Sequence, residues 1–270
     1  MKFTVLLSLY YKENPEYLRQ SLDSILAQTL LPDEIVMVKD GPLTDELEAV
    51  LAEYQARCPY LKIVPLKENV GLGMALNEGL KHCTYEHVAR MDTDDICMPH
   101  RFERQVAVFE AHPEYDLVSA WIDEFVDNIN DVRSTRTLPE FPDQIFEYGK
   151  TRCPVNHPVT MFKKSSVEKV GGYKHCLNLE DYYLWGRMLV AGANFYNIQE
   201  SLLWFRFSED VFKRRGGIRY AKTEARFMWE LHKIGYITAA KALVYGTVRF
   251  CVRVIPNTWR SWVYRNLLRK

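Results

Sequence analysis

Three aspartates within four positions are the part of this sequence best suited to chemistry. Asp92, Asp94 and Asp95 follow an apolar run, Tyr85 to Met91, that has the composition of a strand. Carboxylates this close together repel, and Mg²⁺ or Mn²⁺, which prefers oxygen ligands and often shares them with substrate phosphates, would relieve the repulsion. The segment therefore predicts a metal site that handles a diphosphate. The alternative is a solvated turn whose aspartates cap a helix expected from Pro99.

Two further polar residues lie where strands are expected to end. Ser8 is near the end of the apolar run Phe3–Leu9, and Asp40 follows the run Glu34–Lys39 and precedes Gly41. Runs that alternate with helical patterns predict a mostly parallel sheet with helices on both faces and ligands outside the carboxyl ends of the strands. Ser8 and Asp40 are thus expected near the aspartates, although both could instead only form turns.

The expected elements become less regular after residue 112. In the first half they are the strands Phe3–Leu9, Glu34–Lys39, Leu61–Leu66 and Tyr85–Met91, with helices beginning at Pro15, Thr44, Met74 and Pro99. In the second half we expect strand structure over Asp116–Val126 and Val159–Phe162, a polar loop over Asp127–Pro142, and a helix over Asp181–Val190. No linker separates the halves, so the second half should complete the same domain.

Composition and charge divide the chain. It has 270 residues, 47% hydrophobic, and six cysteines without a C-x-x-C pair, and no signal-like segment opens it, which favours a reduced, cytoplasmic setting. Residues 211–270 carry 14 Lys or Arg against two acidic residues, whereas residues 1–210 carry 21 against 33. This asymmetry suggests a body that handles metal and a tail that meets phosphate, nucleic acid or an anionic membrane.

The end of the tail narrows that choice. From Tyr236 onward there are seven basic residues and no acids, and Lys241, Arg249 and Arg253 interrupt an apolar helical pattern. A stretch so punctuated by charge cannot span a bilayer. A basic amphipathic helix followed by Trp259 and Trp262 is typical of attachment to an anionic membrane surface. Packing on the acidic body or in a dimer is the alternative.

A glycine pair offers a competing function. Gly71 and Gly73 precede a helix, as in dinucleotide-binding proteins. The third glycine of G-x-G-x-x-G is absent, however, and the pair follows the third strand rather than the first. The pattern therefore does not favour a dinucleotide site.

Five ordered motifs resemble the inverting glycosyltransferases of family 2, which have the GT-A fold. They are VLLSLYYKENPEYLRQSLDSILAQT at 5–29, VMVKDG at 36–41, ENVGLGMALNEGL at 68–80, RMDTDDICMPHRFERQ at 90–105 and LEDYYLWGRM at 179–188. The resemblance is strongest to bacterial enzymes that extend lipid-linked O-antigen or exopolysaccharide units. It implies a GT-A catalytic domain over 1–210, with a nucleotide-sugar-binding half (1–112) and an acceptor-side half (113–210), followed by a basic lid and amphipathic helices (211–270).

The resemblance also assigns roles on the donor side. Ser8 and Asp40 match residues that meet the donor's uracil, Asp94 matches a residue of the ribose and the metal, and Asp92 and Asp95 complete the metal carboxylates. His157 matches a histidine that often faces the donor diphosphate and is counted with the metal residues, although a lone histidine is as readily structural.

Two departures from the family pattern affect the donor site. Lys39 replaces an aspartate, and Leu76 replaces an arginine that contacts phosphate or base. We expect Arg90 to supply that contact instead.

A basic lid is expected over the diphosphate. Arg206, Arg214 and Arg215 could form it, with the glycines that follow as a hinge. A solvated basic loop is the alternative.

The acceptor side is assigned to three residues. Inversion requires a base on the face of the sugar opposite the leaving group, and Asp181 of the Glu180-Asp181 pair matches the family's base. Glu180 and Trp185 are expected to bind the acceptor. Helix capping is the alternative for Asp181, and packing in the core is the alternative for Trp185.

These inferences combine into one expected function. The chain should use Mn²⁺ or Mg²⁺ to move a hexose, galactose or an N-acetylhexosamine, from a UDP-sugar to a polyprenyl-diphosphate-linked saccharide. It should work in the cytoplasm, peripherally at the inner face of the cell membrane, on an anionic surface and without nucleic acid. The alternatives are a sugar-phosphate nucleotidyltransferase, disfavoured because Ser8–Asn14 lacks glycine, and a non-catalytic nucleotide-sugar-binding assembly partner.

Overall fold

The computed structural model of the chain describes residues 1–176, 179–207 and 217–254. The chain divides into two units, of which the first joins Met1–His175 to Glu180–Phe207 and the second joins Cys176–Leu179 to Ser208–Lys270. The predicted division at residue 210 lies close to this boundary. The roles assigned to the two parts stay predictions.

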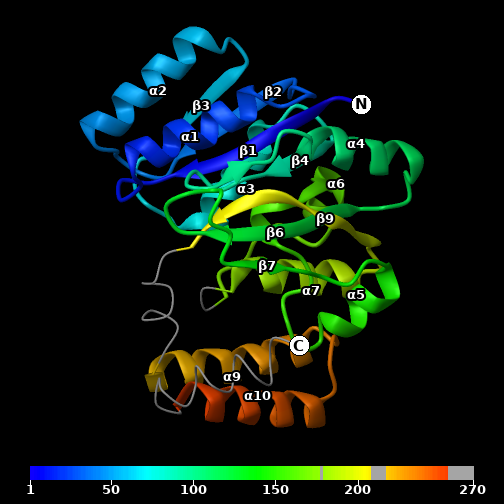
Figure 1. The fold of residues 1–270 in the computed structure, drawn as a ribbon. Coiled ribbons are helices and arrows are strands. Elements are labelled where there is room, and N and C mark those ends of the chain that lie inside the picture. Colours follow the sequence, from blue (N-terminus) through cyan, green and yellow to red (C-terminus); the bar gives the residue numbers. More distant parts are fainter. Residues whose placement is uncertain (177–178, 208–216, 255–270) are drawn as a thin grey trace. The chain divides into compact units, whose positions relative to one another are not determined.

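The first unit is built on a mixed sheet of nine strands among the described residues, in the order β3-β2-β1-β4-β8-β6-β9-β5, with β7 beside β6 (Figure 1). The strands are β1 (Phe3–Leu9), β2 (Glu34–Lys39), β3 (Leu61–Pro65), β4 (His87–Arg90), β5 (Ile96–Cys97), β6 (Leu117–Phe125), β7 (Ser134–Arg136), β8 (Met161–Lys163) and β9 (Phe195–Arg206). The helices of this unit are α1 (Pro15–Leu26), α2 (Asp45–Arg57), α3 (Leu72–His82), α4 (Arg101–Ala111), α5 (Pro142–Tyr148), α6 (Lys164–Lys169) and α7 (Glu180–Val190), and the short 3-10 helix η1 covers His157–Val159.

The parallel part of the sheet agrees with the sequence prediction. Strands β1, β2, β3 and β4 pair in parallel, and Ser8 lies opposite Val38 in the register of β1 and β2. Beyond β4 the sheet is mixed, because β8 is antiparallel to both of its neighbours, β4 and β6. The carboxyl ends of the four parallel strands therefore share one edge, which presents Ser8, Asp40 and the acidic segment.

Helices cover both faces of the sheet, as the alternation in β1 requires. Val5 and Leu7 belong to a buried cluster that also contains side chains of α1, α2 and α4. Leu6 points to the other face, where α3 packs so closely that a Cβ on Gly79 would come within 2.5 Å of the Leu6 side chain. Adjacent residues of a strand face opposite sides, so the side chains on both faces of β1 are buried.

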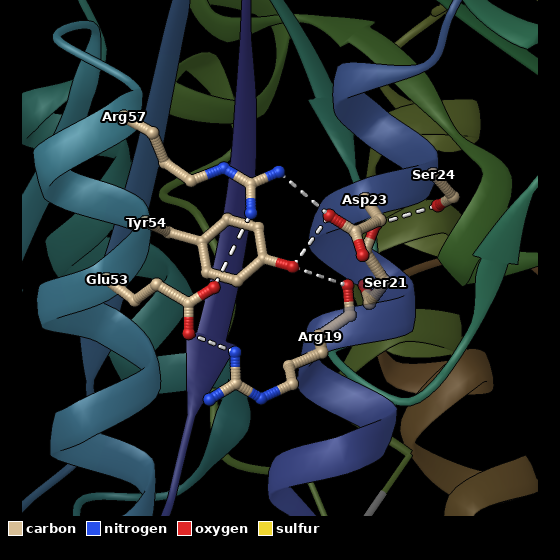
Figure 2. A network of polar contacts seen from close by, with 7 residues as sticks. All are labelled: Arg19, Ser21, Asp23, Ser24, Glu53, Tyr54 and Arg57. Atoms are coloured by element: carbon tan, nitrogen blue, oxygen red, sulfur yellow. Dashed lines mark hydrogen bonds and ion pairs between the residues drawn. The ribbon is translucent and has the colours of Figure 1, made fainter.

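A polar network joins α1 to α2 (Figure 2). The Tyr54 hydroxyl of α2 donates to Asp23 Oδ1 at 2.7 Å, and it also lies 3.1 Å from the Arg19 carbonyl oxygen. Arg57 contacts Asp23 at 3.3 Å, and Arg19 pairs with Glu53. These contacts fix the position of α1, whose opposite side contacts the acidic segment.

The segment that follows β4 is held by two serines of α1 and by Gln28, which lies just beyond the end of that helix. Ser21 Oγ donates to the Asp92 carbonyl at 3.1 Å, and Ser24 Oγ accepts the Cys97 N–H at 3.0 Å. Gln28 Nε2 donates to the Met98 carbonyl at 2.8 Å. A loop with its backbone groups paired in this way is restrained before any ligand binds.

In the far half of the sheet the sequence prediction located β6 and β8 but missed β9 and the short β5. Strand β9 runs parallel to β6 with a register shift beside Trp121, and its end pairs with β5 through Trp204 and Ile96. Ser134–Arg136, expected as loop, forms the short strand β7.

The second unit contains two described helices, α9 (Gly217–Lys233) and α10 (Ala239–Val254), which lie side by side (Figure 1). Among the residues that the structure describes, no helix is both long enough and apolar enough to cross a bilayer. Arg214 and Arg215, expected in a lid, lie outside the described residues.

Candidate active site

The three predicted carboxylates come together directly after β4. Oxygens of Asp92, Asp94 and Asp95 all lie within 4.8 Å of one another. Burial, and then the charge of Asp92, raise the pKa of Asp94 to about 6. Burial, and then the charges of Asp94 and Asp92, raise the pKa of Asp95 well above its ordinary value. Crowding of like charges in a largely buried turn is unfavourable, so this arrangement favours a bound positive charge.

The details of Asp95 fit a divalent cation. Its side chain is fully buried, and Oδ1 accepts the Arg206 N–H at 2.8 Å. Its Oδ2 has no hydrogen-bond partner in the described part of the chain. A buried carboxylate oxygen without a partner is costly, and a metal ion shared with the two neighbouring carboxylates would satisfy it.

Arg90 was expected to contact the donor, but its guanidinium is directed to Asp92. Only 1% of Arg90 is exposed, its Nη1 donates to Asp92 Oδ2 at 2.6 Å, and its Nη2 donates to Asp92 Oδ1. A guanidinium buried in a two-point ion pair is not available to a donor phosphate. Arg90 therefore orients the first aspartate of the group.

Arg206 also differs from its expected role. Its Nε donates to the Asp94 carbonyl at 2.9 Å, its Nη2 donates to Gln20 Oε1 at 2.6 Å, and its guanidinium lies over the Tyr17 ring at 3.9 Å from the centroid. With its backbone N–H bound to Asp95, Arg206 clamps the acidic turn from the end of β9. It is buried in this position rather than placed on a lid.

Asp40 orders the loop that precedes α3. Its Oδ1 accepts the Val70 N–H at 2.7 Å, while its Oδ2 accepts the Gly71 N–H at 3.1 Å and a proton of Asn69 Nδ2 at 3.0 Å. Gly41 is required beside it, because its φ is +88° and a Cβ there would lie 2.7 Å from the Asn69 nitrogen. Contact of Asp40 and Ser8 with uracil stays a prediction. The turn-forming role of Asp40 is present in the structure.

His157 and Trp185 are core residues in this structure. His157 Nε2 lies 2.9 Å from the Tyr173 hydroxyl, and the histidine is not part of the carboxylate group. Burial, and then the charge of Arg90, hold the pKa of His157 well below its usual range, so its imidazole is neutral. Trp185 is fully buried, with its ring centroid 5.7 Å from that of His157 and 6.2 Å from that of Phe162. The metal role of His157 and the sugar-stacking role of Trp185 therefore do not agree with their positions.

Glu180 and Asp181 lie in the first turn of α7, where a helix terminus favours ionised carboxylates. Burial is the main cause that raises the pKa of Tyr173, and the charges of Asp181 and Asp92 raise it further. Tyr173 is thus a common neighbour of the candidate base and of the acidic group. The structure brings the two sets of residues predicted from distant motifs to one region.

The sequence prediction missed the contact between α3 and the segment before α7. Asn77 Nδ2 donates to the Tyr173 carbonyl at 2.7 Å, and Asn77 Oδ1 accepts the Tyr173 N–H at 2.7 Å. A Cβ on Gly73 would lie 3.3 Å from carbons of Glu180 and of Tyr173. Gly73, the second glycine of the pair considered for a dinucleotide site, therefore allows α3 to pack closely against Tyr173 and Glu180. The local sequence gives no signal for this contact.

Glu13 was also missed, although its loop was expected at the ligand edge. Burial, and then the charges of Asp94 and Asp92, raise the pKa of Glu13 to about 8. Glu13 is therefore a fourth acidic group close to the predicted metal site.

Comparisons with known proteins show which family the chain resembles. Residues 6–171 match the family model described as glycosyl transferase family 2. The chain is 36% identical to the UDP-Gal:alpha-D-GlcNAc-diphosphoundecaprenol beta-1,3-galactosyltransferase of Escherichia coli over 100% of this chain and 97% of the relative. It is 40% identical to the amylovoran biosynthesis glycosyltransferase AmsE of Erwinia amylovora over 97% of each chain.

A solved structure supports the fold. The crystal structure of S. aureus TarS 1-349 in complex with UDP-GlcNAc superimposes with a TM-score of 0.71 at 17% identity, covering 100% of this chain and 76% of that one. The predicted GT-A fold is confirmed, and a nucleotidyltransferase is not supported. The chain belongs to glycosyl transferase family 2.

Proposed function

We propose that this enzyme transfers a hexose, galactose or an N-acetylhexosamine, from a UDP-sugar to a polyprenyl-diphosphate-linked saccharide during O-antigen or exopolysaccharide synthesis. The observation that carries the proposal is the acidic group after β4, which lies near Tyr173 together with the candidate base Asp181. The end-to-end similarity to a galactosyltransferase that acts on a diphosphoundecaprenol-linked GlcNAc supports the choice of donor and acceptor.

Asp94 and Asp95 are the residues proposed to hold Mn²⁺ or Mg²⁺. Asp95 offers a buried oxygen without a described partner, and Asp94 carries a carboxylate whose pKa is raised by burial and then by the charge of Asp92. Asp92 adds a third carboxylate, which Arg90 orients. A divalent cation at this site would neutralise charge on the leaving nucleoside diphosphate.

Asp181 is the proposed general base. It would accept the proton of the acceptor hydroxyl as that oxygen attacks the anomeric carbon from the face opposite the leaving group, which inverts the configuration. Its place in the first turn of α7, at the positive end of the helix dipole, suits a negatively charged side chain. Glu180 beside it is proposed to contact the acceptor.

The enzyme is further proposed to work peripherally at the inner face of the cell membrane. Its proposed acceptor is a lipid, and residues 211–270 carry a large excess of positive charge. Basic segments are attracted to anionic leaflets.

A donor screen tests the function. Release of UDP would be measured with UDP-Gal, UDP-GlcNAc, UDP-GalNAc and UDP-Glc, using a short-chain lipid diphosphate GlcNAc as acceptor, with Mn²⁺, with Mg²⁺ and with EDTA. We expect one donor to give acceptor-dependent and metal-dependent release and a β-linked product by NMR. Asp181→Asn is the matched control for release that does not depend on the proposed base. An α-linked product would contradict inversion, and no acceptor-dependent release with any donor would contradict the proposal.

A further inference from the structure

The second unit presents an uncharged helix face to solvent. Six residues of α10 follow the spacing i, i+3, i+4, i+7, i+8, i+11, which places them on a single face of the helix. They are Ala240, Leu243, Val244, Thr247, Val248 and Cys251, and all are exposed. Leu243 is 70% exposed, Val244 57% and Val248 56%. A helix face turned to water normally carries charged side chains, and this face carries none.

The polar group on this face is already satisfied. Thr247 Oγ1 donates to the Leu243 carbonyl at 2.8 Å, one turn earlier in the helix. This hydrogen bond lies within the helix, so the hydroxyl keeps its acceptor when the residue is buried in an apolar medium.

The arginines of α10 face the other way. Arg249 Nη1 donates to Glu224 Oε1 of α9 at 3.1 Å, while Arg253 donates to both oxygens of Glu224 at 2.8 and 3.0 Å. Glu224 is buried, and a Cβ on Gly246 would lie 3.4 Å from the Ala225 carbonyl of α9. The side of α10 that faces α9 is therefore close-packed and ion-paired.

This arrangement changes the expected form of membrane attachment. The sequence suggested that all basic residues after Tyr236 attract lipid, but Arg249 and Arg253 share the carboxylate of Glu224 inside the helix pair, which cancels one of their two positive charges. Their contribution to surface attraction is reduced accordingly. What α10 offers outward is apolar area, bordered by the exposed Lys241.

We infer that the outer face of α10 is a membrane-insertion surface that lies in the interfacial region of the bilayer parallel to its plane. This inference rests on the proposed function, which places the acceptor in a membrane. Two observations favour a membrane over a second copy of the chain. The described helices α9 and α10 hold seven basic residues against two acidic ones, so they attract an anionic leaflet and repel a like-charged copy. Only three large apolar side chains form the face, which is a small core for a stable dimer.

The test is vesicle co-sedimentation of the full chain across salt concentration. Insertion of apolar side chains is not screened by salt, so binding to vesicles with anionic lipid should fall with salt only to a plateau that persists at 1 M. The double variant Leu243→Gln/Val248→Gln should lower this plateau by roughly 100-fold, since about tenfold is expected for each large side chain removed from the interface. Gln keeps good helix propensity.

Controls separate the possible outcomes. Leu31→Gln, at an exposed apolar residue of the first unit, should leave the plateau unchanged. Binding that disappears in salt and is insensitive to the double variant would overturn the inference in favour of charge attraction alone. A variant that still binds vesicles but changes from dimer to monomer would overturn it in favour of a copy interface.

A soluble acceptor distinguishes this inference from the proposed function. Transfer to a short-chain, water-soluble acceptor should be unchanged in Leu243→Gln/Val248→Gln, because the substitutions lie outside the catalytic unit. Absence of transfer in the unsubstituted enzyme would contradict the proposed function and would leave the vesicle result to be judged separately.

Discussion

Asp92 and Asp94 stand two positions apart, yet replacing each with Asn should change the stability of the metal-free enzyme in opposite directions. Asp92 is the partner of Arg90, whose guanidinium is 1% exposed and whose Nε has no hydrogen-bond partner among the described residues. Removing one member of a buried pair typically costs ~3–5 kcal/mol, because a charge is left without compensation. Asp92 is partly exposed and Asn can still accept one bond, so we expect the lower end, about 3 kcal/mol. At roughly 2–4 °C for each kcal/mol, the Tm of Asp92→Asn should fall by about 6–12 °C.

Among the described residues, Asp94 forms no such ion pair. Burial and the charge of Asp92 raise its pKa from 3.8 to about 6, so its ionised form destabilises the folded state. At pH 7.5 the upper limit of this cost is ~3 kcal/mol, from 1.36 kcal/mol for each pKa unit. Asp94→Asn removes the charge and should raise the Tm of the metal-free protein. Because the folded pKa lies above the unfolded one, the cost develops between pH 3.8 and about 6, and the advantage of the variant should shrink as the pH falls through that window.

Differential scanning fluorimetry in EDTA measures both changes at pH 7.5. Asp131→Asn, at an exposed aspartate 3.8 Å from Arg133, is the matched control and should leave the Tm unchanged. A Tm for Asp92→Asn equal to or above that of the unsubstituted protein would refute the idea that Asp92 compensates Arg90. Equal destabilisation by both variants would show that the crowding at Asp94 is relieved in some other way.

Three further outcomes follow from the same geometry. Protons and a cation compete for carboxylates whose pKa values are about 6 for Asp94 and about 8 for Glu13, so the rise in Tm on adding Mn²⁺ should be larger at pH 8 than at pH 5.5, and equal rises would contradict this. Asp181→Asn should lower kcat by roughly 10²–10⁴-fold while the Kd for UDP, measured by calorimetry, stays unchanged; loss of UDP affinity would place Asp181 in the donor site. Gly73→Ala should lower kcat by about threefold to tenfold, because the new methyl pushes on Glu180 at the start of α7 and small misplacements are costly. Its Tm should hold, since Ala is favoured over Gly in a helix, and an unchanged kcat would show that this contact does not position the base.

The first half of the fold could be predicted because its signals are local. Strands β1 and β2 are short, mostly apolar runs whose two faces are both buried. Each is followed by a helix with its own start signal: the Asn14 side chain accepts the Glu16 N–H at 2.8 Å, and the Thr44 side chain accepts the Leu47 N–H at 3.4 Å. Strand β9 gave no such signal. Gln199 and Glu200 interrupt its apolar pattern, and its pairing depends on β6, which is distant in the sequence.

The acidic residues of the candidate site could be located from the sequence, but the contacts of its arginines could not. Carboxylates that follow a strand in a parallel sheet must lie at the ligand edge, so Asp92, Asp94 and Asp95 were placed by their positions alone. A sequence does not show whether an arginine faces solvent or a buried partner. Arg90 and Arg206 were assigned to the donor on charge, and both are instead bound to the acidic turn.

Those internal contacts explain how an acidic turn can be ready for a metal before one binds. The Asp92 carbonyl is held by Ser21, the Asp94 carbonyl by Arg206 and the Asp92 carboxylate by Arg90. The backbone of the turn is thus bound on both sides and keeps the carboxylates buried and close together, and burial followed by their mutual repulsion raises the pKa values of Asp94 and Asp95. The clamps therefore keep the repulsion on the carboxylate oxygens, which is where a divalent cation would relieve it.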